Sequence, residues 1–281
     1  MRTRMKNKDL QIFVLSFGRT KVPTLKEIKH PEDVIVLTST DNKFKDKIEA
    51  HGAQVVVFDK ESFKGRGIEM MNEESVPQKR SAVYGYNYAI DWGREHGVRY
   101  ILVLDDDYIA TEYINDRNRG TFPYIDVWAR HAVEFLKKHP QIGATCAINN
   151  GQLMSNSRSA YFTNLRKRQL MNTIIFDTTK EQHFESLGNG DYVTQAIMNT
   201  GSRDMIVRLQ TISLRMETIK QKKHETIDYA GMFYKRWALK MAEPAYGDVR
   251  ILKGGQKGNI LTTRFNSVWH SNSAPKIINL E

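Results

Sequence analysis

The chain has 281 residues, of which 40% are hydrophobic and 26% charged, and it carries a net charge of +10 with a pI near 9.5. These fractions are typical of a globular protein with a substantial core. No apolar run approaches the roughly 20 residues that cross a bilayer, so we expect no membrane-spanning segment. The apolar stretch after the basic N-terminus is too short for a signal peptide, and we therefore expect a cytoplasmic protein.

The excess of positive charge indicates an anionic partner. A nucleotide does not need so much charge spread over a whole chain, so DNA or RNA is a candidate partner, and a generic basic protein without such a partner is the alternative. The densest basic groups outside the N-terminal half are Arg166, Lys167, Arg168, Lys220, Lys222 and Lys223.

The N-terminal part alternates apolar and polar segments. We expect a strand over 11–20 that ends in a turn, and further strands over 33–39 and 53–58. A helix is expected over 43–51, between the second and the third strand. Strands and helices that alternate at this spacing predict right-handed crossovers and a mostly parallel α/β sheet. Polar groups at the ends of the first two strands are candidate ligand contacts at the sheet edge. They are Ser16, Gly18, Arg19 and Thr38.

A loop over 59–74 precedes a helix predicted over 76–96, which Gly97 ends. A cation, an aromatic ring and an amide recur along one side of this helix, at Arg80, Tyr84 and Asn87. Their spacing of four and then three residues places them on a common face. They are candidates for contacting a ligand, and a solvated helix face is the alternative.

The strand predicted over 100–104 is continuously apolar and ends at Asp105, Asp106 and Asp107. Such a run is typical of a fully buried strand that delivers its acids to the edge of a sheet. Three adjacent carboxylates repel one another, and a divalent cation with hard oxygen ligands is the natural counter-charge. A solvated acidic turn is the alternative interpretation.

The rest of the chain is expected to add further strands and helices. A polar loop is predicted over 111–120, a helix from Pro123 to His139, and a strand over 142–148 that buries Cys146 as an inert thiol. Later strands are predicted over 171–177, 249–252 and 260–264, a loose strand pair over 205–216 and a helix over 228–242.

Two residues of the later part are candidates for chemistry. Asp191 follows a Gly-Asn-Gly turn and could act as a general base toward an attacking hydroxyl, or simply cap a helix. His270 stands in a polar tail and could complete a metal shell together with Asp105 and Asp107, or lie on the surface. The metal ion held by Asp105 and Asp107 would neutralise the charge that develops on a departing diphosphate.

The first strand, the helix with Arg80 and Asn87, and the Asp105-Asp106-Asp107 strand end resemble the nucleotide-sugar half of GT-A glycosyltransferases. In that family an Asp-x-Asp motif holds Mn²⁺ or Mg²⁺ against the diphosphate of the donor. The resemblance implies a single Rossmann-like domain over 1–281, with a donor half over 10–110 and a smaller acceptor-binding α+β half over 111–281. It implies that Tyr84 and Asp106 belong to the donor site, and that Asp191 and His270 are the acceptor-side acid and the third metal ligand.

The whole chain, with its basic balance, is also similar to phage-type enzymes that glycosylate 5-hydroxymethylated pyrimidines in DNA. This similarity implies a UDP-sugar donor, a 5-hydroxymethylcytosine-like acceptor in DNA, and the host cytoplasm as the place of action. Trp269 or Tyr192 could stack on a base taken out of the duplex. Two other readings remain open, a nucleic-acid-binding protein without catalysis and a carboxylate-metal nuclease or nucleotidyltransferase.

Overall fold

The structure is a computed structural model. It describes residues 9–63, 83–115, 118–121, 124–140, 142–149, 173–180, 205–216, 249–252 and 260–263. The candidates Arg80, Asp191 and His270 lie outside these ranges, as do the basic groups at 166–168 and 220–223. In the described part, no helix is long and apolar enough to cross a membrane.

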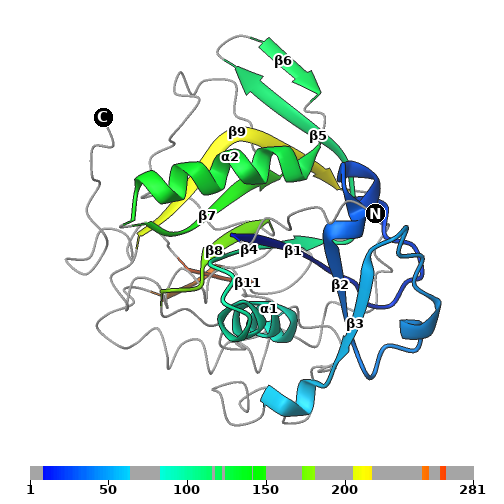
Figure 1. Ribbon diagram of the computed structural model, residues 1–281. Helices are drawn as coiled ribbons and strands as arrows, with labels where there is room; N and C mark the ends of the chain where they lie inside the picture. The colour runs from blue at the N-terminus through cyan, green and yellow to red at the C-terminus, as the bar shows by residue number, and fades with distance from the viewer. Residues whose placement is uncertain are drawn as a thin grey trace.

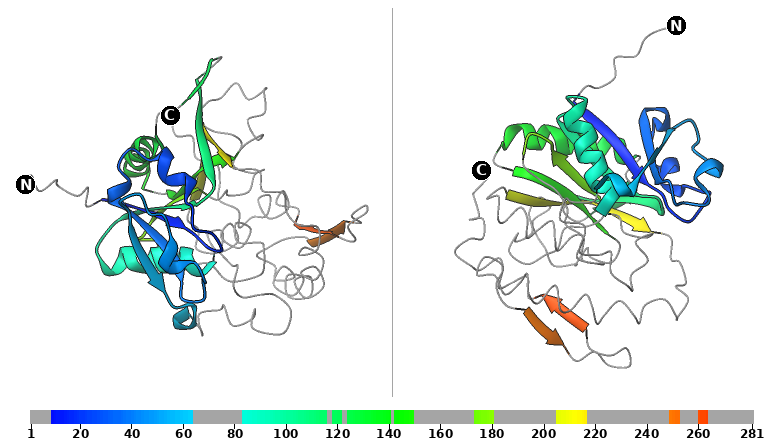
Figure 2. Two further views of the ribbon diagram at one scale, coloured as in Figure 1. Left: turned by 90° about the vertical axis from the view of Figure 1, so that its right-hand side faces the viewer. Right: turned by 90° about the horizontal axis from the view of Figure 1, so that it is seen from below.

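Nine strands of the described chain form one sheet in the order β3-β2-β1-β4-β8-β7-β9-β5-β6, and two more form a separate antiparallel pair (Figures 1 and 2). The strands of the main sheet are β1 (Leu10–Leu15), β2 (Val34–Ser39), β3 (Gln54–Phe58), β4 (Tyr100–Asp105), β5 (Tyr108–Asn115), β6 (Asn118–Thr121), β7 (Ile142–Asn149), β8 (Ile174–Asp177) and β9 (Met205–Met216). The pair consists of β10 (Val249–Leu252) and β11 (Ile260–Thr263).

The direction of the strands confirms the predicted fold class. β3, β2, β1 and β4 pair in parallel, which is the arrangement expected when each strand returns by a crossover to the same edge. Within the described sheet only β8 and β5 run opposite to β1, because β7 and β9 pair in parallel and β6 is antiparallel to β5. The chain therefore folds as a Rossmann-like α/β protein with a mostly parallel sheet.

Two α-helices cover opposite faces of this sheet (Figure 1). Helix α1 (Val83–Glu95) packs on the face that carries Phe13 and Val103, and helix α2 (Ile125–Lys138) packs on the face that carries Val14 and Leu104. Side chains alternate between the two faces along each strand, so the continuous apolar run of β4 is buried on both sides. The position of β4 inside the sheet, with a helix on each face, therefore explains its continuous apolar sequence.

Helix α1 approaches the sheet closely at two glycines. A Cβ on Gly93 would lie 2.7 Å from both Cδ1 and Cγ1 of Ile101, and one on Gly85 would lie 2.6 Å from Cδ2 of Leu15. The helix ends at Glu95, and Gly97 takes a φ of 65°, as the sequence predicted for its C-terminal signal. The predicted segment before Val83 lies outside the described residues.

Three sequence-based predictions of local structure are wrong. The helix expected over 43–51 is only a short 3₁₀ turn, η3 (Lys45–Lys47), because the segment offers Phe44 and Ile48 but no full apolar stripe. In the polar loop expected over 111–120, residues 111–115 belong to β5 and residues 118–120 to β6, and the strand pair expected over 205–216 is the single strand β9. Backbone pairing of β5 with β6 and β9 makes residues 111–115 and 118–120 extended although they are mostly polar.

The other connections near the N-terminus are short 3₁₀ helices: η1 (Pro23–Glu27), η2 (Pro31–Asp33) and η4 (Lys60–Phe63). Most strand predictions are confirmed within a few residues, and Cys146 is a buried free thiol as expected. The helix predicted over 228–242 lies outside the described residues.

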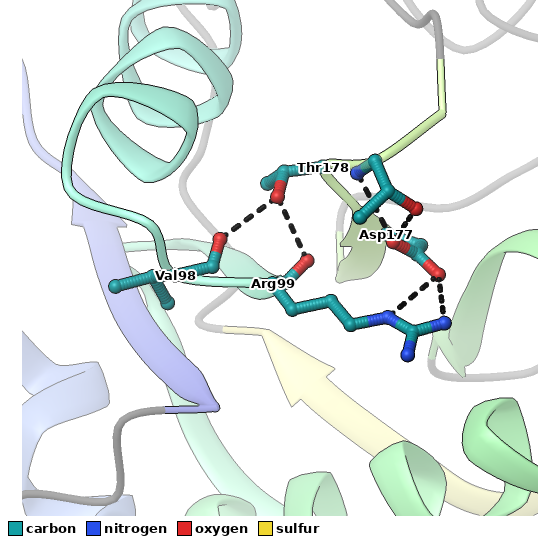
Figure 3. Close-up of polar contacts among 5 residues, drawn as sticks. Val98, Arg99, Asp177 and Thr178 are labelled. Carbon is teal, nitrogen blue, oxygen red and sulfur yellow. Dashed lines mark hydrogen bonds and ion pairs between the residues drawn. The ribbon is translucent and has the colours of Figure 1, made fainter.

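The amino-terminal end of β4 is tied to the end of β8 by polar contacts (Figure 3). Arg99 donates through Nε and Nη2 to Oδ2 of Asp177, at 3.2 and 3.0 Å. Thr178 donates from Oγ1 to the backbone oxygens of Val98 and Arg99, at 2.8 and 3.0 Å. Asp177 is buried, and its other oxygen, Oδ1, accepts the N–H and the hydroxyl of Thr179 at 3.1 and 2.6 Å, so Arg99 and Thr179 together compensate for the desolvation of this carboxylate.

Candidate active site

A pocket of about 250 Å³ lies where the carboxyl ends of β1, β2 and β4 meet. These strands are parallel and in register, with Leu15 paired to both Leu37 and Asp105, so the residues that follow them converge on one edge. The volume is near the lower end of the roughly 300–1,000 Å³ typical of small-molecule sites. Its described lining is Leu15, Ser16, Phe17, Arg19, Leu37, Thr38, Ser39, Phe58, Lys60, Gly85, Asp105, Asp106 and Asp107.

Asp106 turns its side chain toward the loop after β1. Its Oδ2 accepts a hydrogen bond from Oγ of Ser16 at 2.8 Å and lies 3.4 Å from Nε of Arg19. Burial raises the pKa of Asp106 to about 6, while Arg19 and Ser16 act against this rise and the neighbouring Asp107 adds to it. The middle acid of the triplet is therefore held by side chains of the protein, with only 9% of its side chain exposed.

Thr24 fixes the backbone of the acidic turn. Its Oγ1 donates to the carbonyl oxygen of Asp105 at 2.7 Å and accepts the N–H of Tyr108 at 2.9 Å. Its own N–H donates to the carbonyl oxygen of Asp106 at 3.3 Å. Thr24 is fully buried in η1, so the turn that carries the acids is anchored to the segment after β1.

The loop after β2 is ordered by an amide. Asn42 donates from Nδ2 to Oγ1 of Thr38 at 2.7 Å, and its Oδ1 accepts the N–H of Phe44 at 3.1 Å and that of Gly18 at 3.4 Å. Gly18 has a φ of 79°, a conformation that glycine adopts without strain. The amide thereby links the loops after β1 and β2 at the rim of the pocket.

Lys60 closes the pocket on the side of β3. Its Nζ lies 3.2 Å from Oδ2 of Asp41, 4.6 Å from the centre of the Phe17 ring and 5.7 Å from that of Tyr84. Cation–π attraction and the ion pair together restrain an ammonium whose side chain is only 13% exposed. The site therefore contains a second cation with a restrained position, in addition to Arg19.

Asp105 and Asp107 have the chemistry that a divalent cation requires. Both line the pocket and offer carboxylate oxygens, the ligand type that Mg²⁺ and Mn²⁺ prefer. Within the described ranges, no group of three or more His, Cys, Asp and Glu side chains is arranged to hold an ion. Magnesium is usually bound through one or two carboxylates plus substrate phosphates and water, so two acids fit an ion that shares its shell with a phosphorylated ligand.

Six of the nine described candidates line this pocket: Ser16, Arg19, Thr38, Asp105, Asp106 and Asp107. Gly18 is not part of the lining but stands between Phe17 and Arg19, which both line the pocket. Tyr84 and Asn87 are both 4% exposed, so they do not form a solvated helix face, but neither lines the pocket. The roles assigned to Arg80, Asp191 and His270 stay predictions, because these residues lie outside the described part.

Sequence reasoning missed several residues of the site, among them Asn42, Thr24 and Lys60. Thr24 gave no signal, because its partners are backbone atoms more than 80 positions away in the chain. Lys60 could have been found, since it follows β3 directly and the ends of parallel strands gather at the same edge.

No protein-family model and no curated protein matches the chain. Solved structures with a similar fold include glucosyl-3-phosphoglycerate synthase from Mycobacterium tuberculosis in complex with Mn²⁺, UDP-glucose and phosphoglyceric acid. It is 13% identical, with a TM-score of 0.45, over 88% of this chain and 85% of that chain.

Two further neighbours are S. aureus TarS 1–349 and a CMP:2-keto-3-deoxy-manno-octonic acid synthetase complexed with CTP. TarS is 12% identical with a TM-score of 0.33, over 84% of this chain and 73% of its own. The synthetase is 12% identical with a TM-score of 0.36, over 84% and 99%. At these values the ligands of the neighbours say nothing about those of this chain, which have to be argued from its own side chains.

Proposed function

We propose that the chain is a metal-dependent glycosyltransferase that moves a sugar from a nucleotide-sugar donor, a UDP-sugar, to a hydroxyl acceptor. One observation carries this proposal: three carboxylates, two fixed cations and several hydroxyls line the same pocket at the carboxyl edge of the parallel strands. Cations suit the phosphates of a nucleotide, and the acids suit the metal ion that accompanies them. A site for a small neutral ligand would need neither.

Two acids, one cation and two hydroxyls of the pocket have parts in this reaction. Asp105 and Asp107 would hold Mn²⁺ or Mg²⁺, which supplies positive charge to the departing diphosphate when it is bound. Arg19 and the hydroxyls of Ser16 and Thr38 would orient the phosphates and ribose. A general base on the acceptor side would take the hydroxyl proton, and Asp191 is our candidate for it.

The donor proposal is tested by nucleotide binding in the presence and absence of Mn²⁺. We expect UDP to raise the melting temperature of the wild-type protein in Mn²⁺, and Asp107→Asn to abolish this rise. Asp126→Asn is a control for the loss of one carboxylate charge, because Asp126 pairs with Arg130 on α2 and does not line the pocket. A Mn²⁺-dependent rise that persists in Asp107→Asn would contradict the metal assignment.

The reaction itself separates this proposal from the alternatives. A glycosyltransferase should hydrolyse UDP-glucose slowly in Mn²⁺, a nucleotidyltransferase or nuclease should act on UTP or DNA instead, and a pure binding protein should turn over none of them. Turnover of UTP or DNA without turnover of any nucleotide sugar would replace the proposal with the phosphoryl-transfer alternative.

We further propose that the acceptor is DNA that carries 5-hydroxymethylated pyrimidines, as in phage-type enzymes. The net charge of +10 supports a polyanionic acceptor, since a nucleotide donor does not need it. Two duplexes of identical sequence, one with cytosine and one with 5-hydroxymethylcytosine, provide the test. Mass analysis of the nucleosides should show added sugar only in the second duplex, and donor hydrolysis without transfer to it would reject this acceptor alone.

A further inference from the structure

Asp106 differs from the other two acids of the triplet in what it contacts. Asp105 and Asp107 are half-buried, whereas Asp106 is buried and directs one oxygen at two side chains of the loop after β1. That oxygen, Oδ2, accepts the hydrogen bond of Ser16 and forms the ion pair with Arg19. The carboxylate of Asp106 therefore already has partners within the protein. It links the turn after β4 to the loop after β1, and both segments border the pocket.

The ion pair also constrains the guanidinium. Arg19 meets Asp106 through Nε, and among the described residues this is its one recorded ion pair. A guanidinium is planar and carries five N–H donors in a fixed geometry, so contact through Nε sets the direction of the remaining donors. Arg19 lines the pocket with 28% of its side chain exposed, and a guanidinium held there can receive an anion.

We propose that Asp106 is a positioning residue, which holds Ser16 and Arg19 so that Arg19 meets the diphosphate of the donor in one orientation. This inference rests on the proposed function and deepens it. It assigns different tasks to neighbouring acids: Asp105 and Asp107 face the metal, while Asp106 acts through Arg19. Asp106 then contacts neither the metal nor the nucleotide.

A double-mutant cycle on UDP affinity tests this role. Asp106→Asn keeps the shape of the side chain but removes its charge, and we expect it to weaken UDP binding about tenfold, the size of one charge-assisted hydrogen bond. Arg19→Gln should weaken binding at least as much. If Asp106 acts through Arg19, the double variant should bind UDP no more weakly than Arg19→Gln alone. Losses that multiply would show an independent contact and overturn the proposal.

The dependence on Mn²⁺ separates positioning from metal binding. For Asp106→Asn, the ratio of UDP affinities measured with and without Mn²⁺ should equal that of the wild type, whereas for Asp107→Asn the ratio should fall toward one. If the ratio for Asp106→Asn also fell toward one, Asp106 would be a metal ligand and the positioning role would be rejected. Asp126→Asn, with Arg130 at 3.4 Å, controls for the loss of a buried carboxylate beside an arginine and should change neither quantity.

The ligand-free protein provides a readout that does not depend on the function. Arg19→Gln should lower the urea midpoint more in the wild type than in Asp106→Asn, because only the former leaves a buried charge without its cation. Equal effects in both backgrounds would contradict the pairing itself. If the wild type binds neither UDP nor UDP-glucose, the proposed function fails together with the role of Arg19, whereas nucleotide binding with multiplicative losses rejects the positioning role alone.

Discussion

The hydroxyl of Thr24 accepts a hydrogen bond from the backbone N–H of Tyr108 at 2.9 Å, across 84 positions of the chain. The same oxygen donates to the carbonyl of Asp105, so one side chain spans the acidic turn from its first residue to the residue after its last. The turn leaves β4 and enters β5, and its geometry is therefore set by a residue of η1 rather than by its own sequence. Any ligand of Asp105 and Asp107 depends on this anchor.

Thr24→Val removes the hydroxyl while keeping the shape of the side chain. We expect it to destabilise the protein by about 1–3 kcal/mol, because the buried backbone groups of Asp105 and Tyr108 lose their partner. Urea unfolding measures the loss, and Thr24→Ser, which keeps the hydroxyl, is the control. A valine variant as stable as the serine variant would show that the hydrogen bonds do not matter.

Gly93→Ala tests the close approach of α1 to the sheet. Alanine should favour the helix by about 0.5–1 kcal/mol, but overpacking against Ile101 should cost about 1–3 kcal/mol, so we expect net destabilisation. Gly85→Ala should be milder in thermal unfolding, since its new Cβ meets only the Leu15 side chain, whereas that of Gly93 meets both Ile101 and Thr178. Ile101→Ala removes both Cδ1 and Cγ1, so Gly93→Ala should cost less in this background than in the wild type, and an equal cost in both backgrounds would locate the strain elsewhere.

The ion pair between Arg99 and Asp177 lies at the opposite edge of the sheet from the pocket. One end of β4 is at Tyr100 and the other at Asp105, so about 16 Å separates the two edges at roughly 3.3 Å per residue. Asp177→Asn should lower the free energy of unfolding by about 1–2 kcal/mol through its weaker hydrogen bonds. It should leave UDP affinity unchanged, and a parallel loss of affinity would mean that the two edges are coupled.

The sequence predicted the centre of this fold and site because the signal there is strong. A continuous apolar run identifies a strand buried on both faces, and three acids after it identify a charged strand end. β5 was missed because its pairing with β9 and β6 uses backbone groups, which leave little trace in residue types. The burial of Asn87 was missed for a related reason: spacing places a residue on a helix face but does not tell what covers that face.

The last prediction concerns the acceptor and rests on charge. Each phosphate contact releases counterions, so duplex DNA held by six to ten contacts should bind about 10³- to 10⁵-fold more weakly at 200 mM than at 50 mM salt. We expect the simultaneous change of Arg166, Lys167 and Arg168 to Gln to weaken binding and to lower the slope of log K against log salt by about 2–3. Fluorescence anisotropy of a labelled duplex measures both quantities.

A control with the same change in net charge separates local contacts from the general field of the protein. Arg130, Lys137 and Lys138 lie on α2, away from the residues that line the pocket, and their change to Gln removes three charges as well. If DNA contacts the 166–168 cluster, only the first triple variant should lower the slope, because the slope counts phosphates that are neutralised directly. Equal slopes in both variants would reject the 166–168 cluster as the DNA contact. Affinity that does not change with salt would argue against DNA as the acceptor and leave the nucleotide-sugar site to serve a small hydroxyl compound.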